Sequence, residues 1–216
     1  MNIEQARFNM IEQQIRPWNV LDQDVLALLG VVKREDYFPE DQKSMAFFDT
    51  ELALPGGAYT LSPKVEARIV QGVAVKKHES VLLIGSGTGY LAALLAHQAR
   101  HVTVMEAIPE LKAMAEANLL KNGVSNVDVQ WCDALKTKHA NTYDVIVVSG
   151  SLESLPDDLQ QQLNNGGRLF IVVGKPPVMK AQVITRESEL FFNSTTLFET
   201  SVQRLSQAVR ESTFTF

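Results

Sequence analysis

The chain has 216 residues, of which 45% are hydrophobic and 21% charged, a balance that is ordinary for a soluble globular domain. Its formal net charge of −5 argues against nucleic acid or an anionic membrane surface as a partner. The lone cysteine, Cys132, excludes an intrachain disulfide, and the N-terminus lacks the apolar core of a signal peptide. We therefore expect a single cytoplasmic domain with a sizeable core.

The first 61 residues predict a helical and irregular N-terminal extension. The segment Ile3–Arg16 has apolar side chains at helical spacing, and Pro17 ends that pattern. Asp22 is placed to cap a second helix, because its side chain can accept hydrogen bonds from the first amides of the helix. Prolines and glycines interrupt the segment Asp36–Leu61, so we expect a connector that covers one edge of the domain.

Strand and helix patterns alternate in residues 62–200, which predicts a three-layer α/β core with a mostly parallel sheet. Ser62 and Pro63 open a helix that runs to Val73, with Ser62 as its N-cap. Further helices are expected at Tyr90–Gln98, Pro109–Asn122 and Pro156–Asn164. Strands are expected at Ser80–Ile84, His101–Met105, Val127–Trp131, Tyr143–Val148, Gly167–Val173, Ala181–Thr185 and Glu189–Leu197. No helix separates the last two strands, as in an antiparallel pair at a sheet edge, and residues 201–216 form a C-terminal tail.

The most informative motif is the glycine-rich turn that follows the apolar run Val81–Ile84. Its glycines are Gly85, Gly87 and Gly89, and Tyr90 stands where the dinucleotide fingerprint places its third glycine. A bulky ring there argues against close packing over a pyrophosphate, so a nicotinamide oxidoreductase is disfavoured. The Gly-x-Gly-x-Gly spacing is similar to that of S-adenosylmethionine methyltransferases, whose ligand carries no phosphate.

Two acidic residues follow the next two predicted strands. Glu106 comes about 20 residues after the glycine turn, the spacing at which a carboxylate meets ribose hydroxyls. Asp133 follows the third strand, where it either bonds an adenine amino group or caps a loop. The four histidines show no metal-ligand spacing, so we expect no metal. The pattern predicts an adenosine-containing cofactor between Glu106 and Asp133.

Seven short segments, in this order along the chain, resemble the protein-L-isoaspartate O-methyltransferases, and the resemblance runs from about Val25 to Thr185. The segments are Val-Lys-Arg-Glu at 32–35, Leu-Ala-Leu-Pro at 52–55, Tyr-Thr-Leu-Ser at 59–62, Ile-Gly-Ser-Gly-Thr-Gly-Tyr at 84–90, Val-Thr-Val-Met-Glu at 102–106, Cys-Asp-Ala at 132–134 and Tyr-Asp-Val-Ile-Val-Val at 143–148. The Thr-Leu-Ser segment is the most family-specific, because other S-adenosylmethionine enzymes share only the later motifs.

The resemblance implies a seven-stranded, Rossmann-like S-adenosylmethionine methyltransferase fold. It implies methyl transfer to the free carboxylate of an isoaspartyl residue in a damaged protein or peptide, after which the methyl ester closes to a succinimide and allows repair. Ser62 falls at the position of the family serine that lies beside the transferred methyl group and the substrate. The cofactor-binding residues are then Gly85, Ser86, Gly87, Gly89, Glu106, Asp133 and Ala134.

The chain departs from the family pattern at four places. Leu83 stands in the strand before the glycine turn, where the family usually carries an acid. Tyr59 replaces the usual glutamine, Pro63 follows Ser62 directly, and Cys-Asp-Ala at 132–134 replaces Gly-Asp-Gly. If the missing acid makes one charge-assisted hydrogen bond, Leu83 weakens cofactor binding by about 1.5–3 kcal/mol without abolishing it.

Methyl transfer to a carboxylate needs no general base, since that group is already ionised at neutral pH, and alignment and desolvation can carry the reaction. Two other interpretations stay open. One is an S-adenosylmethionine methyltransferase with another acceptor, in which Tyr59 and Pro63 reshape the acceptor pocket. The other is a non-catalytic interaction protein on the same scaffold, with Leu83 as the sign of lost binding. The first interpretation predicts S-adenosylmethionine as cofactor and an isoaspartyl protein or peptide as partner, with neither nucleic acid nor a membrane.

Overall fold

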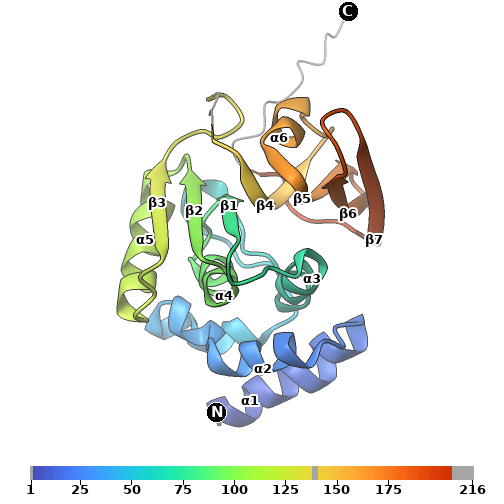
Figure 1. The fold of residues 1–216 in the computed structure, drawn as a ribbon. Helices are drawn as coiled ribbons and strands as arrows, with labels where there is room; N and C mark the ends of the chain where they lie inside the picture. The colour runs from blue at the N-terminus through green and yellow to red at the C-terminus, as the bar shows by residue number, and fades with distance from the viewer. Residues whose placement is uncertain (1, 138–140, 206–216) are drawn as a thin grey trace, which may run out of the picture.

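Seven strands form one sheet in the computed structural model, which describes residues 2–137 and 141–205. The strand order is β3-β2-β1-β4-β5-β6-β7; β1 to β5 run parallel, and β6 and β7 each pair antiparallel with the preceding strand. The strands are β1 (Ser80–Ile84), β2 (His101–Glu106), β3 (Val127–Trp131), β4 (Tyr143–Leu152), β5 (Leu163–Lys175), β6 (Val178–Arg186) and β7 (Phe192–Thr200). The expected mostly parallel sheet with an antiparallel edge is confirmed (Figure 1). Most of the predicted tail, residues 206–216, lies outside the described residues.

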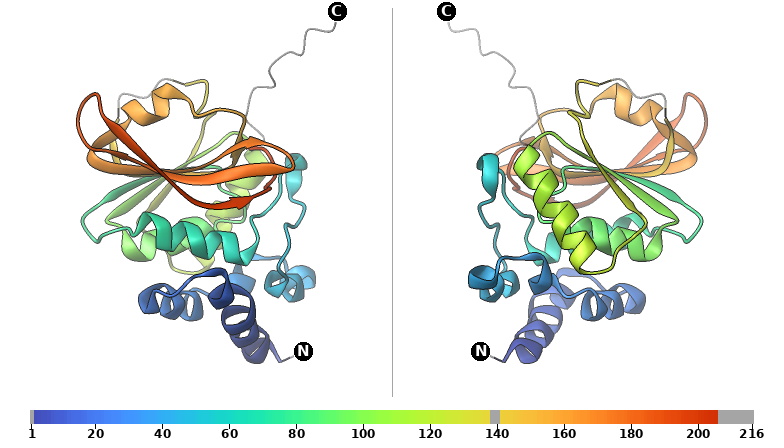
Figure 2. Two further views of the ribbon diagram at one scale, coloured as in Figure 1. Left: turned by 90° about the vertical axis from the view of Figure 1, so that its right-hand side faces the viewer. Right: turned by 90° about the vertical axis from the view of Figure 1, so that its left-hand side faces the viewer.

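Helices cover both faces of the sheet, as Figure 2 shows. α3, α4 and α5 lie against one face, and the short α6 lies against the other. α1 and α2 of the N-terminal extension lie beyond α3 and α4, farther from the sheet (Figures 1 and 2). The helices are α1 (Ile3–Asn9), α2 (Gln23–Val31), α3 (Pro63–Val73), α4 (Tyr90–Gln98), α5 (Pro109–Lys121) and α6 (Asp157–Gln161). Within the described ranges, no helix combines the length and the apolar character needed to cross a bilayer.

β1 lies in the middle of the sheet, between β2 and β4, and both of its faces are buried. Val81 and Leu83 pack in the apolar cluster on the α3–α4 side, while Leu82 and Ile84 pack in the cluster on the α6 side. All four side chains are fully buried. The prediction of a central first strand is confirmed, and the glycine turn that follows Ile84 therefore lies at the carboxyl edge of the sheet, where ligands of such sheets bind.

The predicted single helix over Ile3–Arg16 is wrong in its second half. α1 ends at Asn9, and a π-helical turn, Met10–Ile15, follows it. Met10 and Ile15 are both buried although they are five residues apart. Because a π turn closes its hydrogen bonds over five residues, it brings both side chains to the same side, and core packing thus overrides the regular α-helical pattern.

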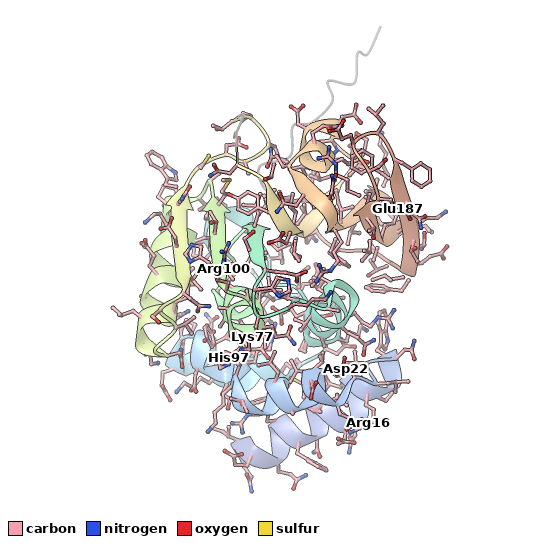
Figure 3. The ribbon with its side chains drawn as sticks, viewed as in Figure 1. Arg16, Asp22, Lys77, His97, Arg100 and Glu187 are labelled. Carbon is pink, nitrogen blue, oxygen red and sulfur yellow. The ribbon has the colours of Figure 1, made fainter. Side chains whose placement is uncertain are left out.

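The two predicted helix caps differ in the structure. Asp22, labelled in Figure 3, caps α2, because its Oδ1 accepts hydrogen bonds from the amides of Asp24 at 2.9 Å and Val25 at 3.3 Å. Ser62 occupies the N-cap position of α3, but its side chain makes no capping hydrogen bond. Pro63 occupies the first helical position, where the amide hydrogen that it lacks would have no partner within the helix.

The predicted helix Pro156–Asn164 is wrong beyond its first turns. α6 covers only Asp157–Gln161, and β5 begins at Leu163, before the predicted Gly167. Leu163 is fully buried and pairs with Tyr143 of β4. Burial and strand pairing outweigh the helical pattern of so short a segment.

The connector between α2 and α3 covers the edge of the domain near α5, as predicted. It contains three 3-10 turns, η3 (Arg34–Tyr37), η4 (Glu40–Phe47) and η5 (Pro55–Gly57). The Asn118 side chain of α5 donates a hydrogen bond to the Tyr37 carbonyl oxygen at 3.0 Å. The connector therefore rests on α5 and leads the chain back towards the glycine turn.

Arg34 is buried inside this connector, with 1% of its surface exposed. Its Nε donates a hydrogen bond to Glu66 Oε2 of α3 at 2.7 Å. Its Nη1 donates to the Ala46 carbonyl oxygen at 2.7 Å, and its Nη2 donates to the Leu61 carbonyl oxygen at 2.8 Å. One guanidinium group thus joins α3 to two separate points of the connector.

We expect Arg34→Lys to lower the free energy of unfolding by about 3–5 kcal/mol, because an ammonium group keeps the charge but lacks the planar fork that reaches three acceptors. Urea denaturation followed by circular dichroism measures the change. Arg16→Lys is the control: Arg16, labelled in Figure 3, pairs with Glu12, the two side chains are 38% and 33% exposed, and such a pair contributes about 0–1 kcal/mol. Equal losses in the two variants would contradict the central role of Arg34.

Candidate cofactor and acceptor site

The glycine turn Gly85–Gly89 has a left-handed backbone at each of its three glycines, with φ of 89°, 52° and 90°. L side chains rarely adopt such φ values. A Cβ atom on Gly87 would meet nothing closer than Leu54 Cδ1, at 4.0 Å. A Cβ atom on Gly89 would lie 3.2 Å from the Cα of Ala115 in α5. The turn therefore leaves room for a ligand to approach its backbone at Gly87 and packs tightly on α5 at Gly89.

Glu106, the predicted ribose ligand, is tied to this turn. Its carboxylate is buried, and Oε2 accepts hydrogen bonds from the Ser86 amide at 2.7 Å and the Ser86 hydroxyl at 2.8 Å. Oε1 accepts a hydrogen bond from the Ile108 amide at 2.9 Å. A carboxylate has about four acceptor positions, so these three bonds leave one for a ligand hydroxyl. The structure thus brings Glu106 and the glycine turn together, as the sequence predicts.

Asp133 and Ala134 lie just past β3, one strand over from Glu106. Asp133 Oδ1 accepts a hydrogen bond from the Leu135 amide at 3.2 Å, and Oδ2 pairs with Lys136 Nζ at 2.9 Å. Asp133 therefore caps its own turn in this structure, one of the two alternatives that the sequence left open. Ala134 is buried against the apolar cluster on the α6 side of the sheet.

A small cavity lies between the glycine turn and the end of the connector. Its volume is about 20 Å³, space for a group the size of a water molecule. It is lined by Tyr59, Thr60, Leu61, Glu66, Gly85, Ser86, Gly87, Thr88, Tyr90, Leu91 and Ser149. Tyr59, which departs from the family pattern, and Thr60 and Leu61 of the family-specific Thr-Leu-Ser segment thus line the cavity together with the turn.

Ser62 faces a different space. It lines a groove of about 310 Å³ together with Trp18 and Lys64, and the cavity at the glycine turn does not reach it. Ser62 is 7% exposed, and its hydroxyl makes no hydrogen bond with any residue in the described ranges. Leu61 and Ser62 are neighbours in the chain but line different spaces, so Ser62 does not share a cavity with the glycine turn.

Two buried polar residues of the cavity wall were missed by the sequence analysis. Glu66 is 5% exposed, and burial raises the pKa of its carboxyl group although the Arg34 guanidinium opposes that shift. Tyr90 is 2% exposed, and its hydroxyl has no hydrogen-bond partner among residues 2–137 and 141–205. Burial also raises the pKa of this phenol. Arg34 and Tyr90 both lie in short segments that resemble the family, at 32–35 and 84–90, and these were the sequence signals available for this cluster.

The segment after β7 pairs with the carboxyl end of β4. β4 continues past the predicted end at Val148, and its last residues pair with β5. On the other side, Ser151 exchanges backbone hydrogen bonds of 3.0 Å with Gln203 and Leu205. A Cβ atom on Gly150 would lie 2.9 Å from the Cα of Leu205. Gly150 is therefore required for this close packing.

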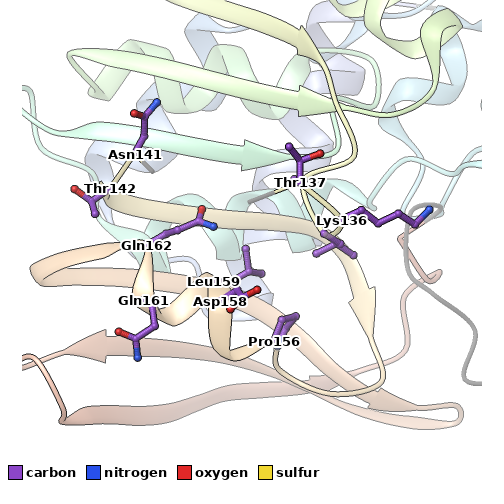
Figure 4. Close-up of a pocket in the computed structure, with 11 residues that line it drawn as sticks. Lys136, Thr137, Asn141, Thr142, Pro156, Asp158, Leu159, Gln161 and Gln162 are labelled. Atoms are coloured by element: carbon purple, nitrogen blue, oxygen red, sulfur yellow. The ribbon is translucent and has the colours of Figure 1, made fainter. Parts of the chain in front are cut away.

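A larger cavity, of about 270 Å³, opens on the other face of the sheet, between the turn after β3 and α6 (Figure 4). Residues around it include Lys136, Thr137 and Gln162. Ala134, one of the predicted cofactor-binding residues, lines this cavity, whereas Glu106 and the glycine turn do not. Across residues 2–137 and 141–205, no group of three or more His, Cys, Asp or Glu side chains could hold a metal ion.

The fold and the glycine turn define a Rossmann-like methyltransferase, and comparison with known proteins gives the family. Residues 5–202 match the family model described as protein-L-isoaspartate (D-aspartate) O-methyltransferase. The chain is 37% identical over 182 residues to protein-L-isoaspartate O-methyltransferase 2 of Anaeromyxobacter sp. (strain Fw109-5), a match that covers 84% of this chain and 74% of the relative. It is 35% identical to the Rhodopseudomonas palustris (strain ATCC BAA-98 / CGA009) protein-L-isoaspartate O-methyltransferase over 84% of this chain and 83% of that one.

Solved structures agree with this assignment at the level of the fold. A Plasmodium falciparum chain assigned to the same methyltransferase family and crystallised with S-adenosyl-L-homocysteine superimposes with a TM-score of 0.79. The match covers 95% of this chain and 98% of that chain, at 19% sequence identity. The chain belongs to the protein-L-isoaspartate O-methyltransferase family and is an S-adenosylmethionine-dependent methyltransferase.

The residues at the glycine turn fit S-adenosylmethionine. Glu106 keeps one acceptor position for a ribose hydroxyl, and the backbone at Gly87 is open to a ligand. These are buried, oriented groups of the kind that hold a polar ligand in a fixed position.

We expect Glu106→Gln to weaken binding of S-adenosylhomocysteine by about 1.5–3 kcal/mol, because the ligand loses a charge-assisted hydrogen bond. Isothermal titration calorimetry measures this loss. A 2′-deoxy analogue of the same ligand separates direct contact from disorder of the turn: the variant should lose much less affinity for a ligand that already lacks the hydroxyl. Equal losses for both ligands would mean that Glu106 acts only by holding Ser86.

Proposed function

We propose that this chain transfers a methyl group from S-adenosylmethionine to the free carboxylate of an isoaspartyl residue in a damaged protein or peptide. The observation that carries the proposal is the buried tie between Glu106 and Ser86, which fixes a ribose-binding carboxylate against an open glycine turn. Family membership supports the isoaspartyl acceptor. The methyl ester then closes to a succinimide, from which normal aspartate can form.

The main contribution of the protein to this reaction is to hold the cofactor and the acceptor carboxylate in the correct relative position. When bound, S-adenosylmethionine supplies a sulfonium methyl group, which passes to the acceptor oxygen as the carbon–sulfur bond breaks and leaves its electron pair on sulfur. A carboxyl group of the acceptor kind ordinarily has a pKa of about 4, so the chain need not remove a proton from it. Consistent with this, the described residues that line the cavity include no histidine or cysteine. Holding two reactants in line and excluding water can supply most of the rate.

The segment Tyr59–Ser62 is the proposed boundary between the two reactants. Arg34 holds the Leu61 carbonyl oxygen, and Thr60 Oγ1 accepts a hydrogen bond from the Leu52 amide at 2.9 Å. These two hydrogen bonds fix Thr60 and Leu61. Leu61 lines the cavity at the glycine turn, and Ser62 lines the open groove. We assign the cavity side to the cofactor and the groove side, with the free Ser62 hydroxyl, to the acceptor.

We further propose that the chain works as one domain in the cytoplasm. Apolar residues of the N-terminal extension and of the core belong to one packed cluster, which supports a single unit. The single cysteine supports a reducing compartment.

The deciding experiment offers the purified chain tritiated S-adenosylmethionine and two synthetic peptides that differ only in an isoaspartyl or an aspartyl residue. We expect base-labile methyl ester on the isoaspartyl peptide alone. Cofactor binding without label on either peptide would indicate another acceptor. No binding of the cofactor, tested by calorimetry and by a shift in melting temperature, would leave an interaction protein as the remaining interpretation.

Ser62→Ala tests the assignment of the groove. The Ser62 hydroxyl makes no capping bond, so we expect the free energy of unfolding to change by less than the roughly 1 kcal/mol of a lost cap. Turnover of the isoaspartyl peptide should fall while affinity for S-adenosylhomocysteine stays the same. Ser188→Ala, in the exposed turn between β6 and β7, is the matched control. Unaltered turnover in Ser62→Ala would place the acceptor elsewhere.

A further inference from the structure

β1 supplies no acid to the cofactor site. The resemblance to the family places an acid at the position of Leu83, but the Leu83 side chain is apolar and fully buried on the α3–α4 side of the sheet. The same apolar cluster contains Val65 of α3 and Leu91 of α4. An acid at position 83 would thus point to the same face of the sheet as α3, and a carboxylate carried by α3 lies on that face too.

Glu66 provides that carboxylate. It lies in the first turn of α3 and lines the cavity that the glycine turn also lines. Its Oε2 accepts the Arg34 hydrogen bond at 2.7 Å, and its Oε1 makes no hydrogen bond with any residue of the described ranges. One oxygen of a buried carboxylate is thus held in place while the other remains open to a donor.

Arg34 is one cationic partner of the Glu66 carboxylate, and burial favours the binding of a second cation beside it. Burial removes water from the charged form of Glu66 and raises the pKa of the carboxyl group, and the single bond to Arg34 does not restore the usual value. A buried charge is stable only when its remaining acceptor positions are also satisfied. An ammonium group beside Oε1 would meet that need.

Tyr90 lines the same cavity. The residue is 2% exposed, and its oxygen is the only buried side-chain atom without a hydrogen bond among the described residues that line this cavity. A phenol oxygen can accept a hydrogen bond from an ammonium group. The cavity volume of about 20 Å³ matches a group of that size.

We propose that Glu66 and Tyr90 bind the α-ammonium group of S-adenosylmethionine, so that a carboxylate from α3 serves where β1 carries Leu83. The proposal rests on the proposed function for the identity of the cofactor. It makes Glu66 a cofactor-binding residue, in addition to its role as the partner of Arg34.

The test compares two ligands that differ by the amino-acid arm. S-adenosylhomocysteine carries the ammonium group, and 5′-methylthioadenosine has the same adenosine thioether without it. In Glu66→Gln, we expect calorimetry to show a loss of about 10- to 150-fold in affinity for S-adenosylhomocysteine, the range for one charge-assisted hydrogen bond. Affinity for 5′-methylthioadenosine should change by less than twofold. Losses of the same factor for both ligands would overturn the proposal.

Glu35→Gln is the matched control. Glu35 is another buried carboxylate, paired with Arg7, and it does not line the cavity. The control should lower the melting temperature to a comparable degree while leaving the ratio of the two affinities unchanged. A shift of that ratio in Glu35→Gln as large as in Glu66→Gln would show that loss of any buried carboxylate disturbs the site, and would overturn the assignment to Glu66.

A measurement on the unmodified chain keeps the proposal testable if Glu66→Gln does not fold. An analogue of S-adenosylhomocysteine that lacks only the amino group should bind at least tenfold more weakly than the parent, and the analogue that lacks only the carboxylate should keep the greater part of the affinity. Equal affinity of the parent and the deaminated analogue overturns the ammonium pocket alone. No binding of any of these ligands overturns the pocket and the proposed function together.

Discussion

The buried guanidinium of Arg34 is the interaction on which the site depends. It joins Glu66 of α3 to carbonyl oxygens of the connector, and its central carbon also lies over the rings of Phe38 and Tyr90, 5.0 and 5.8 Å from their centroids. A charge so deeply buried is stable only if its donors are satisfied, and here each acceptor belongs to a different part of the chain. The N-terminal extension is therefore a structural part of the site, because it positions one wall of the cavity.

The core of the fold was largely predictable because its signals are local. The strand before the glycine turn is apolar on both faces, and the turn requires glycines at positions with positive φ. The position of Glu106 at the same edge of the sheet as the glycine turn also followed, since carboxyl ends of neighbouring parallel strands meet at one edge, but its hydrogen bonds to Ser86 were not predicted. Patterns of two to four residues are enough to specify such features.

The remaining features depend on contacts between distant residues. Nothing in the sequence near Glu66 reveals that its partner is Arg34, which lies 32 positions earlier. The π turn at Met10 and the early start of β5 at Leu163 both follow from burial, which local propensity does not report. Ser62 shows the same limit, because its place at the helix start was predictable but the direction of its side chain was not.

The close packing of Leu205 on Gly150 has a consequence for synthesis of the chain. The glycine turn leaves the ribosome well before Leu205, and at roughly 5–20 residues per second the interval lasts several seconds. During that time β4 lacks the backbone partners that Gln203 and Leu205 provide to Ser151, so its edge is exposed. The site thus reaches its final shape only after nearly all of the described chain has been made, and an incomplete chain would present an unpaired strand end instead.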